Sequence, residues 1–89
     1  MSESDPGTDP ADLSDPELDR ILEELEAEET EVSRLRRRLH DRLASFPNEV
    51  TMQQEREIST RRRALHVRID ALRAERSRRR DELADHPDG

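Results

Sequence analysis

Apolar residues recur every seven positions in two stretches of this chain. In the first stretch they are Leu18, Leu25, Val32, Leu39 and Phe46. In the second stretch they are Ile58, Leu65 and Leu72. A seven-residue apolar repeat is typical of helices that pack as coiled coils. The pattern therefore predicts two long α-helices.

Capping and breaking residues set the expected ends of these helices. Ser14 followed by Glu17 is a capping box at a helix start. Pro47 cannot continue a helix, and it disfavours helical backbone at the residue before it. Thr51 followed by Gln54 repeats the capping pattern. These signals predict helices over about 15–45 and 51–84.

The predicted fold class is all-α. A short connection makes neighbouring helices antiparallel, so residues 14–84 are expected to form an antiparallel two-helix coiled-coil hairpin. Residues 1–13 are rich in Ser, Asp and Pro, and we expect a disordered acidic N-terminal leader there. Residues 85–89 are expected to be a frayed tail.

The remaining seam positions carry charge in the middle of the hairpin. In the first helix these positions are Leu22, Glu29, Arg36 and Leu43. In the second they are Arg62, Ile69, Arg76 and Leu83. A charged seam position forgoes roughly 1.5–3 kcal/mol of apolar burial compared with Leu. The seam is thus predicted to be apolar at both ends and polar between them.

One five-residue pattern occurs in both helices, offset by 26 positions. In the second helix it reads Glu55, Ser59, Arg62, His66 and Asp70. In the first it reads Glu29, Ser33, Arg36, His40 and Ala44. At about 100° per residue, the five side chains fall within roughly 80° of one helix face. We call the nine polar residues of the two copies the polar stripe, and we interpret it as a binding site.

The position of the turn, near Pro47, predicts which residues of the two antiparallel helices lie level with one another. Residues whose numbers sum to roughly 98 should lie level, which sets Arg36 beside Arg62 and Glu29 beside Asp70. The acidic stretch 17–31 would then face the arginines of 67–81, and this complementarity favours the pairing.

Composition narrows the class of protein. With 29% hydrophobic, 1% aromatic and 44% charged residues, the chain has little material for a globular core. It has no cysteine and no apolar run of the roughly 20 residues needed to cross a bilayer. We therefore expect a cytoplasmic protein that makes no use of a membrane. No nucleophile with a base and no phosphate loop is evident, so we do not expect an enzyme.

The polar stripe has the chemistry to bind guanines and phosphates. Arginine can bind guanine O6 and N7 with two hydrogen bonds, and carboxylates can accept from guanine N1 and N2. Serine and further arginines suit phosphate. A site repeated about a two-fold axis suits a ligand that is itself two-fold.

At this point the sequence resembles a known family. The pattern Glu-x3-Ser-x2-Arg-x3-Gln-x3-Asp on antiparallel helices is the cyclic-di-GMP signature of RsiG, the anti-sigma factor family of actinobacteria. Here histidine stands at 40 and 66 where the family has Gln, and Ala44 stands where it has Asp. The resemblance covers about residues 17–84. It implies that the chain binds cyclic-di-GMP as its signalling ligand and sequesters a flagellar-type, WhiG-like sigma factor.

Other interpretations stay open. The main alternative is a ligand-free coiled-coil adaptor whose charges only set register. Direct DNA binding by the arginine-rich segment 61–80 is not expected at a net charge of −7 without aromatic residues for stacking. Metal binding by His40 and His66 is not expected either, because no close cluster of ligands accompanies them. A hairpin with so little apolar surface is marginal alone, so a homodimer is one way to stabilise it.

Overall fold

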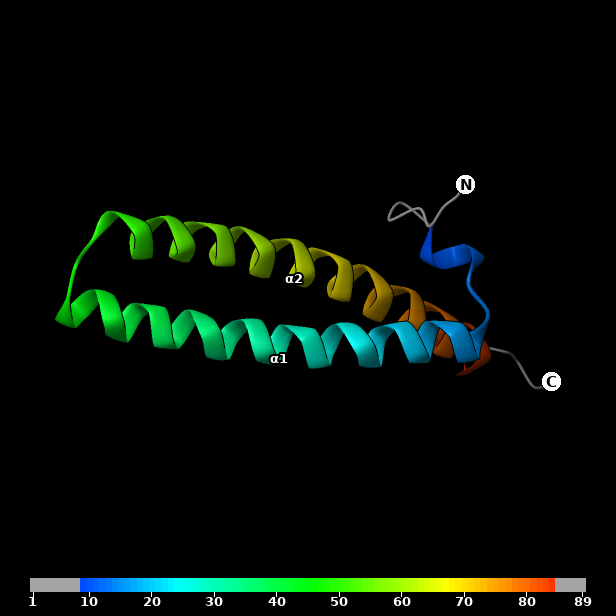
Figure 1. Cartoon of the computed structure of the whole chain (residues 1–89). Helices are drawn as coiled ribbons and strands as arrows, with labels where there is room; N and C mark the ends of the chain where they lie inside the picture. Colours follow the sequence, from blue (N-terminus) through cyan, green and yellow to red (C-terminus); the bar gives the residue numbers. More distant parts are fainter. Residues whose placement is uncertain (1–8, 85–89) are drawn as a thin grey trace.

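The computed structural model describes residues 9–84, which form two long helices and a short 3-10 helix. Helix α1 spans Asp15–Ser45, α2 spans Glu49–Ala84, and η1 spans Pro10–Asp12. The two long helices lie side by side and antiparallel, with their connection at one end and the start of α1 and the end of α2 at the other (Figure 1). The all-α hairpin expected from the sequence is confirmed.

Helix α1 begins and ends where its sequence signals are. The Ser14 hydroxyl accepts from the Glu17 amide at 3.3 Å, and the Glu17 carboxylate accepts from the Ser14 amide at 2.9 Å. This reciprocal pair is the expected capping box. At the other end, Phe46 has φ −139° and ψ 82°, outside the helical range, because Pro47 follows it.

Helix α2 begins two residues earlier than expected. The side-chain oxygen of Asn48 accepts from the Thr51 amide at 2.9 Å, so Asn48 caps this helix. Thr51 is inside the helix and only 4% exposed. The capping box expected at Thr51 and Gln54 is therefore wrong. Asn48 is three residues before Thr51 and has one of the best side chains for capping.

The apolar core is concentrated at the open end of the hairpin. Leu18 and Leu22 of α1 pack there with Ile69 and Leu72 of α2, and Leu13, Ile21 and Leu25 are packed against them. Towards the connection, burial continues through Val32, Leu39 and Leu65. The heptad positions thus face the partner helix along most of the seam, as expected.

Two expected seam residues are exposed instead. Phe46 is 74% exposed because it has left the helix, so the seven-residue period no longer fixes its direction. Leu83 is 77% exposed. Arg79, one turn before it, already pairs with Asp15, the first residue of α1, so Leu83 lies past the end of its partner helix. The seam is therefore less apolar at its two ends than predicted.

Residues 9–13 differ from the disordered leader expected there. The Arg79 guanidinium donates to the carbonyls of Pro10 and Leu13, at 3.2 and 2.7 Å, and this holds η1 against α2. Asp9 caps η1 by accepting from the Ala11 amide at 3.0 Å. The rest of the leader and the tail at 85–89 lie outside the described residues.

Glu75 holds Arg79 in place for this contact. Its carboxylate is only 9% exposed and accepts from Arg79 Nε at 2.6 Å and from Arg78 at 2.7 Å. Hydrogen bonds from Arg78 and then Arg79 lower the pKa of Glu75 from 4.5 to about 2. Glu75 thus links the acidic start of α1 to the basic end of α2.

Acid should weaken this end of the hairpin. Because the folded pKa of Glu75 lies below the unfolded value, its contribution to stability is complete above about pH 4.5 and is lost as the pH falls towards about 2. We expect the melting temperature of Glu75→Gln to depend less on pH in that window than that of the wild type. Glu24→Gln, at an exposed position of α1, is the control. Equal slopes in all three proteins would contradict this role of Glu75.

Candidate functional site

The structure brings eight of the nine polar-stripe residues into one network between the helices. Within each copy, the serine is hydrogen-bonded to the glutamate of the same helix. Ser33 donates to Glu29 and Ser59 donates to Glu55, both at 2.7 Å. These pairs are four residues apart on one helix, as the sequence spacing requires. Each helix thus presents a carboxylate already fixed by its own serine.

Arginine and histidine of each copy then bond across to the other helix. Arg36 donates from Nε to Ser59 Oγ at 3.1 Å, and Arg62 donates from Nε to Ser33 Oγ at 3.0 Å. The Nε2 of His40 lies 2.7 Å from the Glu55 carboxylate. The matching His66–Glu29 distance is 2.9 Å. Every bond of one half has an equivalent in the other, so the network has local two-fold symmetry.

The charged groups alternate instead of clustering by sign. Arg36 Nε lies 3.8 Å from the Glu55 carboxylate, and Arg62 Nε lies 3.7 Å from that of Glu29. The numbers of the bonded pairs sum to 95 and not to 98, so Arg36 lies level with Ser59 and not with Arg62. Glu29 and Asp70 nevertheless line one hollow, as expected. Side chains of α1 bond to residues about one turn nearer the connection on α2. This stagger sets each guanidinium between a serine and a carboxylate.

Hydrogen bonds keep both glutamates ionised. The pKa of Glu29 is lowered mainly by the Ser33 hydroxyl and then by His66. The pKa of Glu55 is lowered mainly by His40 and then by Ser59. Both carboxylates are therefore acceptors at neutral pH, with side chains 23% and 20% exposed. A ligand could reach them from solvent.

Asp70 is the ninth residue of the stripe, and it stands apart from the network. Its side chain makes no hydrogen bond or ion pair with any other described residue. It lines a hollow of about 290 Å³ together with Glu29, His66 and Arg73. The two-fold equivalent of Asp70 is Ala44, so the two halves of the stripe differ at this position.

Most arginines of the segment 61–80 are paired with carboxylates. Within α2, Arg73 bonds to Glu26 at 2.6 Å, and Arg61 bonds to Glu28. Arg76 lies 3.8 Å from Asp19. The charge complementarity expected between 17–31 and 67–81 is present, and it neutralises much of the arginine-rich segment 61–80.

The remaining expectations concern metals and membranes. Within residues 9–84 no group of three or more His, Cys, Asp or Glu side chains is placed to hold a metal ion. Over the same span, neither long helix has an apolar stretch that could cross a bilayer.

A comparison with known protein families gives a match over the second helix. A family model described as RsiG-like matches residues 48–88, which include α2 with Glu55, Ser59, Arg62, His66 and Asp70. No curated protein and no solved structure gives a match. The resemblance inferred from the paired motif is confirmed for residues 48–88, which are similar to the RsiG-like family. The first copy lies outside the matched segment, so its equivalence to the second is supported by the internal repeat and the two-fold network.

Proposed function

We propose that this RsiG-like regulator binds cyclic-di-GMP on the polar stripe and, in that state, sequesters a flagellar-type, WhiG-like sigma factor. The observation that carries the proposal is the two-fold network of serine, arginine, histidine and glutamate between α1 and α2. A ligand with two guanines and two phosphates about its own two-fold axis matches that symmetry.

The proposed contacts follow from the donors and acceptors present. Arg36 and Arg62 are 36% and 34% exposed, and their guanidiniums have free donors for guanine or phosphate beyond the Nε groups bonded to serine. The ionised Glu29 and Glu55 can accept from guanine N1 and N2. Asp70 adds an acceptor in one half of the site. Binding thus adds contacts to groups that the hairpin has already oriented.

Repression would follow from holding the sigma factor away from its polymerase. The ligand bridges both helices in this proposal, so it favours one arrangement of the hairpin, and the sigma factor recognises that arrangement. A nucleic-acid role is less well supported, because Arg61, Arg73 and Arg76 are engaged by carboxylates of α1.

A second candidate is a ligand-free coiled-coil adaptor. One observation favours it: the eight residues of the network already bond to one another without any ligand. In an adaptor, the network would serve only to fix the stagger of the helices. The two candidates differ in whether the chain responds to a guanine dinucleotide.

Thermal unfolding separates them. A ligand that binds only the folded chain stabilises it by about 2.7 kcal/mol at 100 times its dissociation constant, which is a large shift for a domain this small. We expect cyclic-di-GMP to raise the melting temperature and cyclic-di-AMP to leave it unchanged, because adenine lacks the N1 and N2 donors. Identical melting curves with both nucleotides, with and without the sigma factor, would favour the adaptor.

A further inference from the structure

The polar stripe lies on one face of the hairpin. The other face has a groove. The groove holds about 380 Å³ and is lined by residues of both helices near the connection: Leu35, Arg38, Leu39, Arg42, Gln54, Glu57 and Ile58. At about 100° per residue, its α1 residues lie roughly 140° around the helix from the stripe. A ligand on the stripe would therefore not cover the groove.

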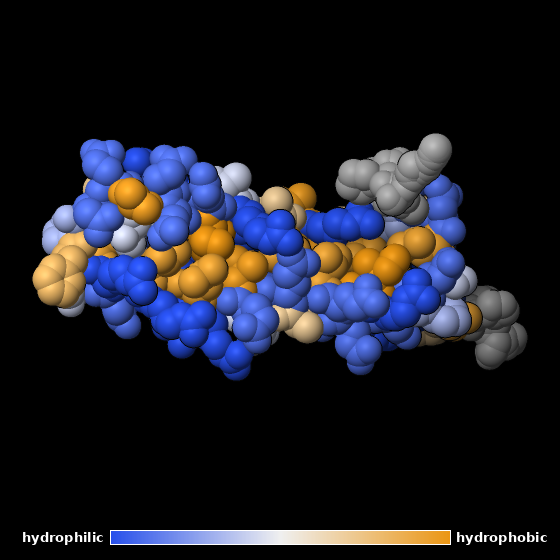
Figure 2. Space-filling model, viewed as in Figure 1, coloured by the Kyte–Doolittle hydropathy of each residue, from blue (hydrophilic) through white to orange (hydrophobic). Residues whose placement is uncertain are grey.

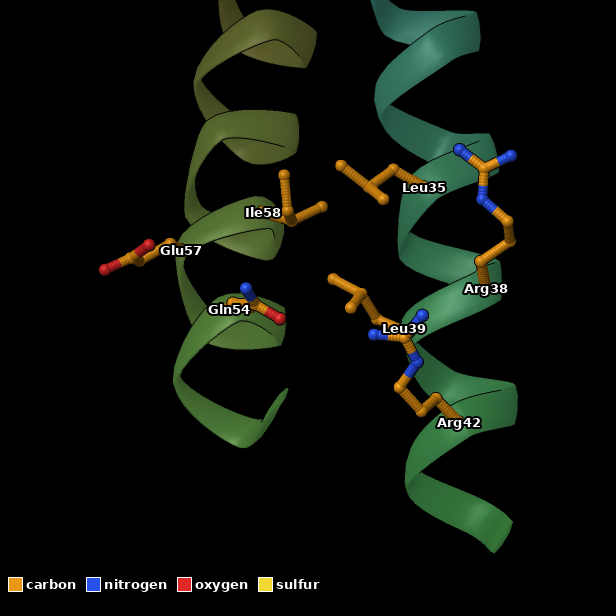
Figure 3. Close-up of a pocket in the computed structure, with 7 residues that line it drawn as sticks. All are labelled: Leu35, Arg38, Leu39, Arg42, Gln54, Glu57 and Ile58. Carbon is orange, nitrogen blue, oxygen red and sulfur yellow. The ribbon is translucent and has the colours of Figure 1, made fainter. Parts of the chain in front are cut away.

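The floor of the groove is apolar. Leu35, Leu39 and Ile58 point towards one another between the helices (Figure 3). Figure 2 shows the same face, where an apolar band runs between two hydrophilic borders. Val50, 68% exposed, lies one helical turn before Gln54 and continues the α2 side of the groove towards the connection. The apolar surface is therefore longer than the groove itself.

The two borders of the groove differ in charge. Arg38 and Arg42 stand along the α1 border, both exposed, and neither guanidinium bonds to any other described residue. On the α2 border, Glu57 points away from the groove in Figure 3 and accepts from Gln53 at 3.1 Å. The α1 border thus offers two guanidiniums that have no acidic partner among the described residues. The paired arginines of the segment 61–80 differ in this respect.

We propose that this groove docks an amphipathic helix of the protein partner, with apolar anchors at helical spacing and acidic residues along the edge that faces α1. A helix laid between two helices buries such anchors at positions i, i+3 or i+4, and i+7. Arg38 and Arg42 are one turn apart, so they match carboxylates one turn apart on the docked helix. This inference rests on the proposed function, since it assigns the sigma factor to the face opposite the ligand.

A second copy of the chain is a poorer occupant. Two grooves placed face to face would set Arg38 and Arg42 either against the same arginines of the other copy or against its α2 border, where Glu57 points away from the groove. Charges of one sign at an interface oppose association. The acidic edge must therefore come from another surface, which the partner supplies.

The test reverses the two charges. Arg38→Glu with Arg42→Glu should weaken binding of a flagellar-type sigma factor at least about tenfold, because two attractive contacts become repulsive. The control, Arg20→Glu with Arg80→Glu, changes the net charge equally at the open end of the hairpin. It should bind the sigma factor like the wild type. Both variants should keep wild-type helicity and wild-type cyclic-di-GMP affinity, since neither touches the stripe.

A synthetic probe makes the test independent of the sigma factor. A labelled helical peptide with Leu at i, i+3 and i+7 and Glu along one edge should bind the wild type and not the groove variant. A peptide of the same composition in scrambled order should bind neither. If the sigma factor fails to bind but the designed peptide discriminates between variants, the anti-sigma assignment is wrong and the groove stands.

Three results would overturn the groove proposal. The first is that the groove variant binds both the sigma factor and the peptide as well as the wild type does. The second is that neither of them binds the wild type. The third is a wild-type dimer, seen by sedimentation, that the groove variant converts to monomer. In that case the occupant is a second copy.

Discussion

We expect replacement of both Arg36 and Arg62 with alanine to abolish measurable binding of cyclic-di-GMP, while the helical content stays at the wild-type level. Each guanidinium provides charge-assisted contacts worth roughly 1.5–3 kcal/mol. Loss of both therefore weakens binding by more than about 100-fold. The helices persist because both arginines are partly exposed seam residues, and alanine favours helix. Isothermal titration at fixed salt, with circular dichroism, measures both effects.

The two single variants sharpen this prediction. Arg36 and Arg62 have equivalent partners, so Arg36→Ala and Arg62→Ala should weaken binding by similar factors. Arg37→Ala with Arg63→Ala is the matched control, because these exposed neighbours are displaced about 100° around each helix from the stripe arginines. Wild-type affinity in the double variant at 36 and 62 would leave the network as a purely structural feature.

Ligand and sigma factor should strengthen each other's binding. In the proposal, the ligand bridges α1 and α2 and favours the arrangement that the partner recognises. Linkage requires the effect to be reciprocal, and couplings of this kind amount to about 1–3 kcal/mol. We therefore expect cyclic-di-GMP to raise the affinity for the sigma factor roughly 5- to 150-fold.

The measurement is a titration of the sigma factor into the chain with and without saturating cyclic-di-GMP. The reverse titration, of ligand into the chain with and without sigma factor, must give the same factor. Equal sigma affinities in the two states would describe a nucleotide-binding hairpin without a switch. The anti-sigma assignment would then have to be withdrawn.

The hairpin was predictable because its signals are local. The heptads fix which side chains face inward, and Pro47 fixes where the first helix ends. The ends were less predictable. Phe46 and Leu83 obey the seven-residue period, but one has left its helix and the other extends past its partner. The seven-residue period predicts the direction of a side chain within a helix. It does not predict whether a partner helix lies opposite that side chain.

The stripe was predictable as a set of residues but not as a network. The spacing of Glu29 and Ser33 already implies a bond within one helix, and the structure has it. The axial stagger between helices is not encoded in the period, so the pairing of Arg36 with Ser59 could not be foreseen. The contact of Arg79 with η1 was missed for a similar reason: it joins segments more than 60 residues apart.

The groove was overlooked because its residues flank the seam. Leu35 is next to the seam residue Arg36, and a seam-based analysis assigns it no role. Its signal in the sequence is the combination of an extra apolar residue with Arg38 and Arg42 on the same helix face. Only the position of Ile58 across from it turns that combination into a groove.

The most direct test of the central claim is a nuclear magnetic resonance map of cyclic-di-GMP on the isotope-labelled chain. The Nε–H groups of Arg36 and Arg62, held by Ser59 and Ser33, report on the stripe. Backbone amides of Leu35, Leu39 and Ile58 report on the opposite face. The account predicts saturable shifts of both arginine signals, with much smaller shifts in the groove. Unmoved signals from Arg36 and Arg62 at saturating ligand, with or without the sigma factor, would contradict it.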